Sequence, residues 1–405
     1  IFMKEKFIPA DKQNFDRRER FIILHYTVLE EKDSVETLTR GGVGAHFLIP
    51  KQPFKDENGS FDYYKFLDIK DRAYHAGVSN FAGRNGLNDT SIGIEIVNYG
   101  YGLVQDTGKV LFTYEVLNQL KDFITETLKE QDKNLYQLLI EEKLLTAFLS
   151  DMTRSLVPPA DREVYKEKIS PELIAKYKKL TKEWHEKNDP FQHVGDLYQL
   201  EKQGKLTWDE YTDHQINSIV DLIKDIQEKL TIKDEKGVYY QIPPQLITGH
   251  ADIAPGRKTD PGTRLWKKLA DRGIGAWPDE QQVSKIEKEI QIEQGIDYKW
   301  IQDNLRHYGY KIETTGQFDT QTKDVIRAFQ MHFEPENYSG EPSVRTISIL
   351  EALIKKYYPS KQSDYPRCFN SSAEKKSKFF STTEGSNTES ETNNHMTPYN
   401  CFVIS

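Results

Sequence analysis

The stretch ITGHADIAPGRKTDPG, residues 247–262, carries the strongest fold signal in the chain. Residues 245–249 form a short run that predicts a strand, and a loop rich in proline and glycine follows it. His250, Lys258 and Asp260 lie on this loop, just past the predicted strand end. Ligand sites of α/β sheets tend to lie at this position. The stretch therefore predicts an α/β sheet with a polar site at the end of one strand.

Three further segments extend the predicted sheet. Residues 21–24 are a continuous apolar run, typical of a strand that is buried on both faces. Residues 45–49 form a second strand candidate, and residues 91–97 alternate isoleucine with glycine or glutamate. The helical spacing of apolar residues predicts helices at 117–128 and 216–226. We expect an α/β fold with a central mixed β-sheet flanked by helices.

The chain divides into three predicted parts. Residues 1–280 form the sheet domain, and the residues at about 104–205 within it read as helical; the family resemblance described below implies that they are an insertion. After a charged connector at 278–294, residues 295–358 form a small domain of three helices. Residues 360–405 are dominated by Ser, Thr, Asn, Lys and Glu, and we expect them to be disordered because they bury little apolar surface.

Composition excludes several classes of function. The 405 residues include 55 basic and 63 acidic side chains, and this net charge of −8 argues against a nucleic-acid-binding protein. No apolar run approaches the roughly 18–20 residues of a transmembrane helix. Cys368 and Cys401, both in the last tenth of the chain, cannot form a thiolate metal site or a disulfide framework for the core. Any metal must therefore be held by nitrogen and oxygen ligands.

A candidate metal site follows from the loop and from one strand. A catalytic zinc needs three protein ligands and one open position, and histidine and aspartate suit it. His250 and Asp260 lie on the loop, and His25 ends the strand at 21–24, where the backbone would fix its direction. Asp252 is a competing oxygen ligand, although we expect it to bond backbone amides within its own turn.

These segments together resemble a known family. RFIILHYT around His25, GVGAHFLI around His46, SIGIEIVN around Glu95 and the stretch at 247–262 are similar to the zinc-dependent N-acetylmuramoyl-L-alanine amidases of the AmpD/AmiD type. Those enzymes share their fold with the peptidoglycan recognition proteins. The resemblance covers about residues 15–102 and 206–277. It implies one zinc ion per chain, held by His25, His250 and Asp260.

The resemblance also implies an activity. Glu95 would be the general base and Lys258 would stabilise the tetrahedral intermediate. The reaction would be hydrolysis of the amide between the lactyl group of N-acetylmuramic acid and L-alanine, in peptidoglycan or muropeptides. A carboxylate can accept the proton of the attacking water, and a compact ammonium can balance the developing oxyanion. The alternative is a non-catalytic peptidoglycan-binding protein on the same fold.

Other residues receive weaker assignments. We expect His46 to support the site from the second layer of residues around the metal. Tyr74, His75 and Asn85 are candidate contacts to the muropeptide. The remaining histidines have no ligand-like context: His185, His193, His214, His307, His332 and His395.

The small C-terminal domain indicates the partner and the place of action. Residues 295–358 resemble the three-helix peptidoglycan-binding domain that is often fused to wall hydrolases. A domain that binds polymeric wall favours the bacterial cell envelope, in the periplasm or associated with the outer membrane. The first residues lack the apolar region of a signal peptide, which fits either a cytoplasmic protein, the alternative location, or a mature or trimmed form whose targeting segment has been removed. The sequence leaves membrane anchoring and the oligomeric state open.

Overall fold

A five-stranded mixed sheet forms the centre of the molecule. The computed structural model describes residues 17–152, 167–234, 237–290 and 295–359, so the tail predicted at 360–405 lies outside the described residues. The strand order is β14-β1-β8-β2-β5, with bounds Ile247–Gly249, Phe21–Tyr26, Ser91–Ile96, Phe47–Ile49 and Tyr64–Lys65. The first four strands are parallel and β5 is antiparallel to β2. The predicted mixed sheet is confirmed.

The two faces of the sheet contact different cores because successive strand residues point to opposite sides. Ile22 and Leu24 of β1 join the isoleucines of β8 in a core under helix α8 (Asp213–Leu230). Phe21 and Ile23 point to the other face, into a core shared with the C-terminal helices. On β8 this second face carries Ser91, Gly93 and Glu95, in register with Phe21, Ile23 and His25. The apolar alternation of β8 thus leaves a polar stripe beside His25.

Shorter elements surround the sheet. Helix α1 spans Glu31–Arg40, α9 spans His250–Ile253 and α10 spans Trp266–Ala270. Two-stranded sheets within the described ranges pair Phe54–Asp56 with Gly59–Phe61 (β3, β4), Asn80–Phe81 with Arg84–Asn85 (β6, β7) and Ile232–Asp234 with Gly237–Tyr240 (β12, β13). Short 3-10 turns span Leu87–Asp89, Pro190–His193 and Pro244–Leu246. Among the described residues, no helix is long and apolar enough to cross a membrane.

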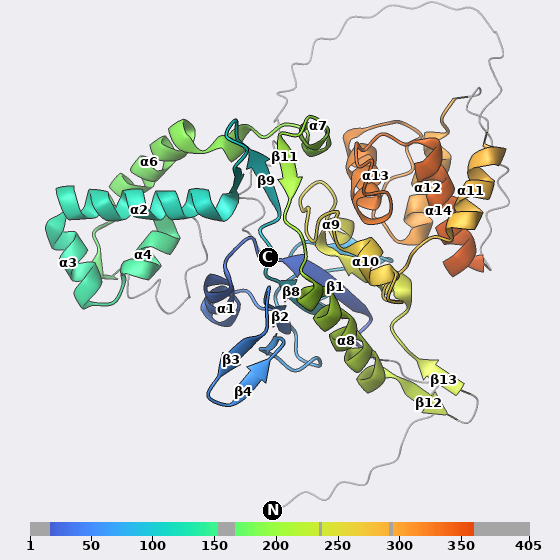
Figure 1. Cartoon of the computed structure of the whole chain (residues 1–405), viewed down its shortest axis with the longest axis horizontal. Coiled ribbons are helices and arrows are strands. Elements are labelled where there is room, and N and C mark those ends of the chain that lie inside the picture. The colour runs from blue at the N-terminus through green and yellow to red at the C-terminus, as the bar shows by residue number, and fades with distance from the viewer. Residues whose placement is uncertain (1–16, 153–166, 235–236, 291–294, 360–405) are drawn as a thin grey trace, which may run out of the picture.

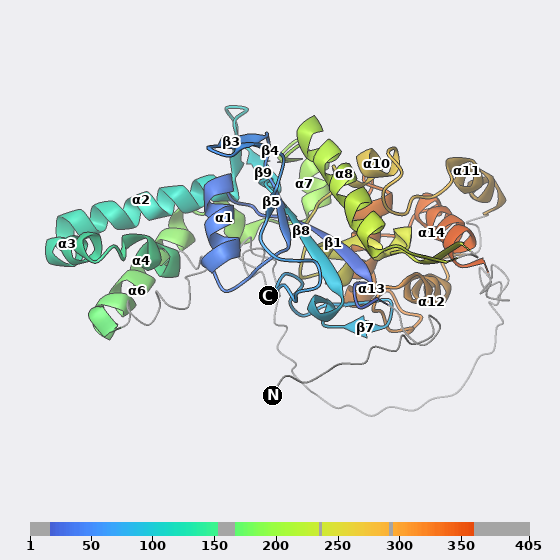
Figure 2. The ribbon, with the colours of Figure 1, turned by 90° about the horizontal axis from the view of Figure 1, so that it is seen from below.

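Most of the insertion forms an arm that projects away from the sheet, while its last helix, α7, lies beside β11 (Figures 1 and 2). Its described helices are α2, α3, α4, α6 and α7, at Thr113–Gln131, Lys133–Glu141, Leu145–Met152, Pro171–Asn188 and Leu197–Lys202. The first four of these helices pack around an apolar core of their own, which includes the buried side chains of Leu120, Ile124 and Tyr177. A small sheet that we did not expect from the sequence joins the arm to the body, in the order β10-β9-β11, at Val110–Phe112, Tyr101–Val104 and Leu206–Trp208.

The three predicted C-terminal helices are present as α12, α13 and α14, at Tyr298–Tyr308, Thr320–Phe333 and Val344–Tyr357. The charged connector is not a plain linker, because Glu280–Glu289 forms helix α11 and buries Val283 and Ile286. These helices share one core with the sheet domain, including Ile23, Phe81 and Ile253. The C-terminal helices therefore pack directly on the sheet domain, on the side opposite the arm (Figure 1).

Candidate metal centre and active site

The carboxyl ends of three parallel strands bring the candidate site together. His25 lies near the end of β1 and is paired in register with Glu95 near the end of β8. Leu24 is paired with Gly249 of β14, and His250 begins α9 directly after that strand. Side chains at paired positions of neighbouring parallel strands point to the same face. Strand register alone thus places two histidines and a glutamate at one edge of the sheet.

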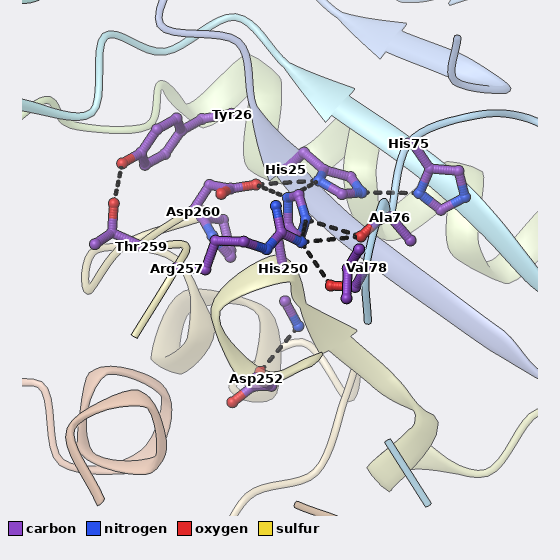
Figure 3. A network of polar contacts seen from close by, with 12 residues as sticks. His25, Tyr26, His75, Ala76, Val78, His250, Asp252, Arg257, Thr259 and Asp260 are labelled. Carbon is purple, nitrogen blue, oxygen red and sulfur yellow. Dashed lines mark hydrogen bonds and ion pairs between the residues drawn. The ribbon is translucent and has the colours of Figure 1, made fainter. Parts of the chain in front are cut away.

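Three ligand-type atoms converge on one point (Figure 3). His25 Nδ1 lies 3.0 Å from His250 Nδ1 and 3.0 Å from Asp260 Oδ2, and His250 Nδ1 lies 3.1 Å from the same oxygen. All three residues are buried. Among the His, Cys, Asp and Glu side chains of the described residues, this is the one group of three or more that could share a metal ion.

The spacing and charge of this cluster fit a tetrahedral zinc ion. Ligand bonds of about 2.0–2.2 Å give edges of about 3.3–3.6 Å in a tetrahedron, slightly longer than the separations here. Burial lowers the pKa of His250 to about 3, so this imidazole is neutral at neutral pH. Burial alone would raise the pKa of Asp260, but the neighbouring His250 and His25 hold it well below its usual range. A neutral imidazole and an ionised carboxylate are the forms that bind metal.

Backbone and hydroxyl contacts fix the loop that carries Asp260. The amide of Ala251 donates to the carbonyl of Asp260 over 2.8 Å, which ties the loop to α9. The Tyr211 hydroxyl donates to the carbonyl of Pro261 over 2.7 Å. The hydroxyls of Tyr26 and Thr259 lie 2.7 Å apart. The aspartate is therefore held from both sides along the chain.

Glu95 is buried without a hydrogen bond. The residue is 1% exposed, and neither carboxylate oxygen has a hydrogen-bond partner among the described residues. Burial raises the pKa of Glu95 to about 7. A buried carboxylate without partners is costly to the fold, and such costs are typical of groups kept for chemistry.

Lys258 is also buried, at 3% exposed, and its charge acts on Glu95 and His250. The positive charge of Lys258 acts to lower the pKa values of Glu95 and His250, although burial is the larger influence on each. The five residues His25, Glu95, His250, Lys258 and Asp260 are thus gathered in one buried site. The resemblance named all five, and the structure places them together.

Two further histidines lie close to the site and have different surroundings. His46 Nδ1 accepts a hydrogen bond from the amide of Gly93, and its Nε2 contacts the carbonyl of Asp71, so it supports strand β8. His75 is fully buried, and its Nδ1 lies 2.9 Å from His25 Nε2. Our expectation of a muropeptide contact does not suit this buried position, because His75 contacts a candidate metal ligand.

The other predicted contacts lie on the surface. Tyr74 is 53% exposed and Val78, four residues further on, is 84% exposed, so both are open to a ligand. The carbonyl of Val78 accepts a hydrogen bond from Arg257, which also bonds the carbonyl of Ala76 beside His250. Asn85 is exposed on strand β7, where it accepts a hydrogen bond from Asn80.

Asp252 points away from the candidate ligands. Its Oδ2 accepts hydrogen bonds from the amide of Gly249 and the hydroxyl of Thr248, so the carboxylate caps helix α9. This is the local role that we expected for it. The same carboxylate also receives hydrogen bonds from Tyr310 and His332 of the C-terminal helices.

Several residues support the site in a way that the sequence did not indicate, including Asn88, which we expected only as a weaker candidate for a muropeptide contact. Asn88 Oδ1 accepts hydrogen bonds from the amides of His75 and Ala76 and so fixes that segment. Ser91 contacts His75, and its place on the polar stripe of β8 was a usable signal. His332 lies 80 residues from Asp252, and no local pattern could have linked the two.

Two family models and a curated relative match this chain. The family model of N-acetylmuramoyl-L-alanine amidase matches residues 15–140 and 165–263, and that of a putative peptidoglycan binding domain matches 294–350. The N-acetylmuramoyl-L-alanine amidase AmiD of Escherichia coli strain K12 is 27% identical over 341 residues, which is 84% of each chain.

Two solved structures are similar over most of their length. AmpDH3 from Pseudomonas aeruginosa, in complex with anhydromuramic pentapeptide, has a TM-score of 0.56 at 28% identity, covering 88% of this chain and 99% of that chain. AmiD from E. coli, in complex with anhydro-N-acetylmuramic acid-L-Ala-D-gamma-Glu-L-Lys, has a TM-score of 0.53 at 26% identity, covering 86% and 93%.

Proposed function

The chain belongs to the N-acetylmuramoyl-L-alanine amidase family, and from that premise we propose that His25, His250 and Asp260 hold one zinc ion. The enzyme hydrolyses the amide between the lactyl group of N-acetylmuramic acid and L-alanine of the stem peptide. The observation that carries the zinc proposal is the convergence of two imidazole nitrogens and one carboxylate oxygen within 3.0–3.1 Å of one another.

We assign the proton transfers to Glu95. When bound, zinc supplies a Lewis acid that polarises the scissile carbonyl and makes a water molecule more acidic. Glu95 accepts the proton of the attacking water and delivers it to the leaving nitrogen, which departs as the amino group of L-alanine. The two free oxygens of Glu95 suit this role, since no hydrogen bond from the described residues has to be broken first.

Lys258 provides the fixed positive charge. As the carbonyl carbon becomes tetrahedral its oxygen gains negative charge, and a buried ammonium stabilises that charge more than a solvated one would. Burial at 3% exposed holds Lys258 in this low-dielectric surrounding. A protein that only recognised peptidoglycan would need neither this lysine nor the costly Glu95, and this favours the amidase over the non-catalytic alternative.

The substrate side of the proposal concerns muropeptides. The two similar solved structures hold anhydromuramic peptides, and we propose the same chemical class here. Tyr74 and Val78 are exposed apolar side chains that flank His75 and Ala76 along the chain, and we propose that they contact the substrate. The match to a peptidoglycan binding domain supports action in the cell envelope, where polymeric wall is found.

Removal of the metal tests the proposal. We expect a chelator to abolish release of free stem peptide from a soluble muropeptide, and zinc to restore it. Asp260→Asn should lower bound zinc from one equivalent to a small fraction, because one of three ligands is weakened. His214→Gln is the matched control: His214 contacts the carbonyl of Asp62, outside the hydrogen-bond network of the cluster, and zinc should stay near one equivalent. Full activity in protein shown to be free of metal would overturn the proposal.

A further inference from the structure

A chain of buried hydrogen bonds runs from strand β8 to a candidate metal ligand. Ser91 Oγ lies 2.6 Å from the carbonyl oxygen of Leu87 and 3.1 Å from His75 Nε2. On the other side of the same ring, His75 Nδ1 lies 2.9 Å from His25 Nε2. Ser91, His75 and His25 are all buried, so water does not compete for these groups.

The positions of the protons follow from the first acceptor. A carbonyl only accepts, so the single hydroxyl proton of Ser91 goes to Leu87, and Ser91 Oγ can then only accept from His75 Nε2–H. A neutral imidazole carries one N–H, and therefore His75 Nδ1 is an acceptor. His25 must supply the proton of that contact from its Nε2. The lone pair of His25 Nδ1 is left facing His250 and Asp260.

The tautomer of the second candidate ligand, His250, follows from a contact to one backbone carbonyl. His250 Nε2 lies 3.2 Å from the carbonyl oxygen of Ala76, which again can only accept. The Arg257 Nη2 group, 3.3 Å from the same ring nitrogen, also faces the carbonyls of Ala76 and Val78, so its protons have partners other than this ring. His250 Nδ1 is therefore also unprotonated. Two lone pairs and a carboxylate about 3 Å apart repel one another unless a cation lies among them.

The packing of His75 keeps this arrangement in place. A Cβ atom on Gly93 would lie 2.5 Å from the His75 ring, so only glycine leaves room for the imidazole against β8. Asn88 holds the backbone of His75 and Ala76 at the same time. The ring is thus held by contacts that do not involve a metal.

We propose that His75 is a positioning residue which, directed by Ser91, fixes the tautomer of His25 and so presents His25 Nδ1 to the metal. This inference rests on the proposed zinc site and adds a specific role for two residues outside the proposed ligand set. Hydrogen bonds to the outer nitrogen of a ligating histidine typically contribute 10–100-fold to metal affinity.

The first test reads the tautomers directly. We expect nitrogen NMR of the zinc-loaded wild type, labelled with ¹⁵N-histidine, to show His75 protonated only at Nε2. The His25 Nε2 proton should be hydrogen-bonded and slow to exchange. A His75 proton on Nδ1 would overturn the proposal, and would do so without affecting the zinc site itself.

The second test measures zinc affinity by competition with a chelator. His75→Leu should weaken zinc binding roughly 10–100-fold, and Ser91→Ala should have a smaller effect in the same direction. His75→Asn, whose side-chain oxygen can take the place of Nδ1, should recover most of the loss.

His185→Leu is the matched control for these variants. His185 is also buried, but it lies on helix α6 of the arm, where its Nδ1 is 3.2 Å from Asp189 Oδ2. Equal losses of zinc affinity in His75→Leu and His185→Leu would contradict the proposal. Failure of the wild type to bind zinc would contradict the proposed function instead.

Discussion

At the scale of single residues, the burial of the Glu95 carboxylate is costly to the fold. It is a buried carboxylate with no hydrogen bond from the described residues, and burial raises its pKa to about 7. A bound cation next to it would favour the ionised form and lower the pKa again. The ionised form of Glu95 is therefore destabilised in the metal-free protein and would be stabilised by a bound cation.

This cost predicts how stability depends on pH. In the unfolded chain the pKa of Glu95 returns to 4.5, below its folded value of about 7, so the folded state holds the extra proton between these values. Metal-free wild type should then lose stability as pH rises through this window, by roughly 3 kcal/mol in total. Glu95→Gln lacks this loss, so its stability relative to wild type should rise by that amount between pH of about 4.5 and about 7.

Urea unfolding in the presence of a chelator, at several pH values, measures this difference. The other ionisable groups are the same in both proteins, so their contributions largely cancel in the comparison. A difference between the two proteins that stays constant with pH would contradict the assignment of a raised pKa to Glu95.

At the scale of elements, β8 combines structure and chemistry in one strand. Its isoleucines enter the core under α8, while Ser91, Gly93 and Glu95 face the site. Gly93 is required for close approach, because His75 fills the space where a side chain would lie.

Gly93→Ala should therefore damage both the fold and the metal site. The added methyl group clashes with the His75 ring, and we expect the free energy of unfolding to fall by roughly 1–3 kcal/mol, as in overpacked cores. Zinc affinity should fall as well, since His75 is displaced from His25. Gly195→Ala is the control, because a Cβ atom there meets nothing within 4 Å. Calorimetry and zinc competition would measure the two effects, and a Gly93→Ala protein with wild-type values in both would show that the ring has room to move.

The elements that sequence could predict are those with a local signal. Strand β1 follows from an apolar run and β8 from alternating isoleucines. His25 could be named from the end of its strand, whereas Glu95 was named through the resemblance to the family. We did not predict helix α11 from the sequence, because most of its residues are charged or polar and only Val283 and Ile286 are buried. The contact between His75 and His25 spans 50 residues of sequence, and only the assembled sheet brings the two together.

At the scale of the whole molecule, the C-terminal helices contact the elements that carry the proposed active site. They share a core with the sheet, and they reach Asp252, which precedes the loop that carries Asp260. Tyr310 and His332 both donate to the Asp252 carboxylate, which caps the helix that begins with His250. From the sequence we expected a separate small domain, whereas the shared core argues that the two parts unfold together.

Tyr310→Phe tests this coupling in the full chain. The change keeps the ring and removes the hydroxyl that bonds Asp252, so we expect the free energy of unfolding to fall by roughly 1–3 kcal/mol. Hydrogen exchange measured by mass spectrometry should show α9 and α13 losing protection together. If only the C-terminal helices became less protected, the two parts would open independently, and this result would contradict the predicted coupling.

The proposed catalytic role of Glu95 is tested most directly by the turnover of Glu95→Gln on a soluble muropeptide, with zinc measured in the same sample. Glutamine keeps the shape of the side chain but cannot accept the proton of the attacking water. We expect one zinc per chain and a rate of amide hydrolysis lower by roughly 10²–10⁴-fold. Turnover within about threefold of wild type, at full zinc content, would contradict the assignment of Glu95 as the base.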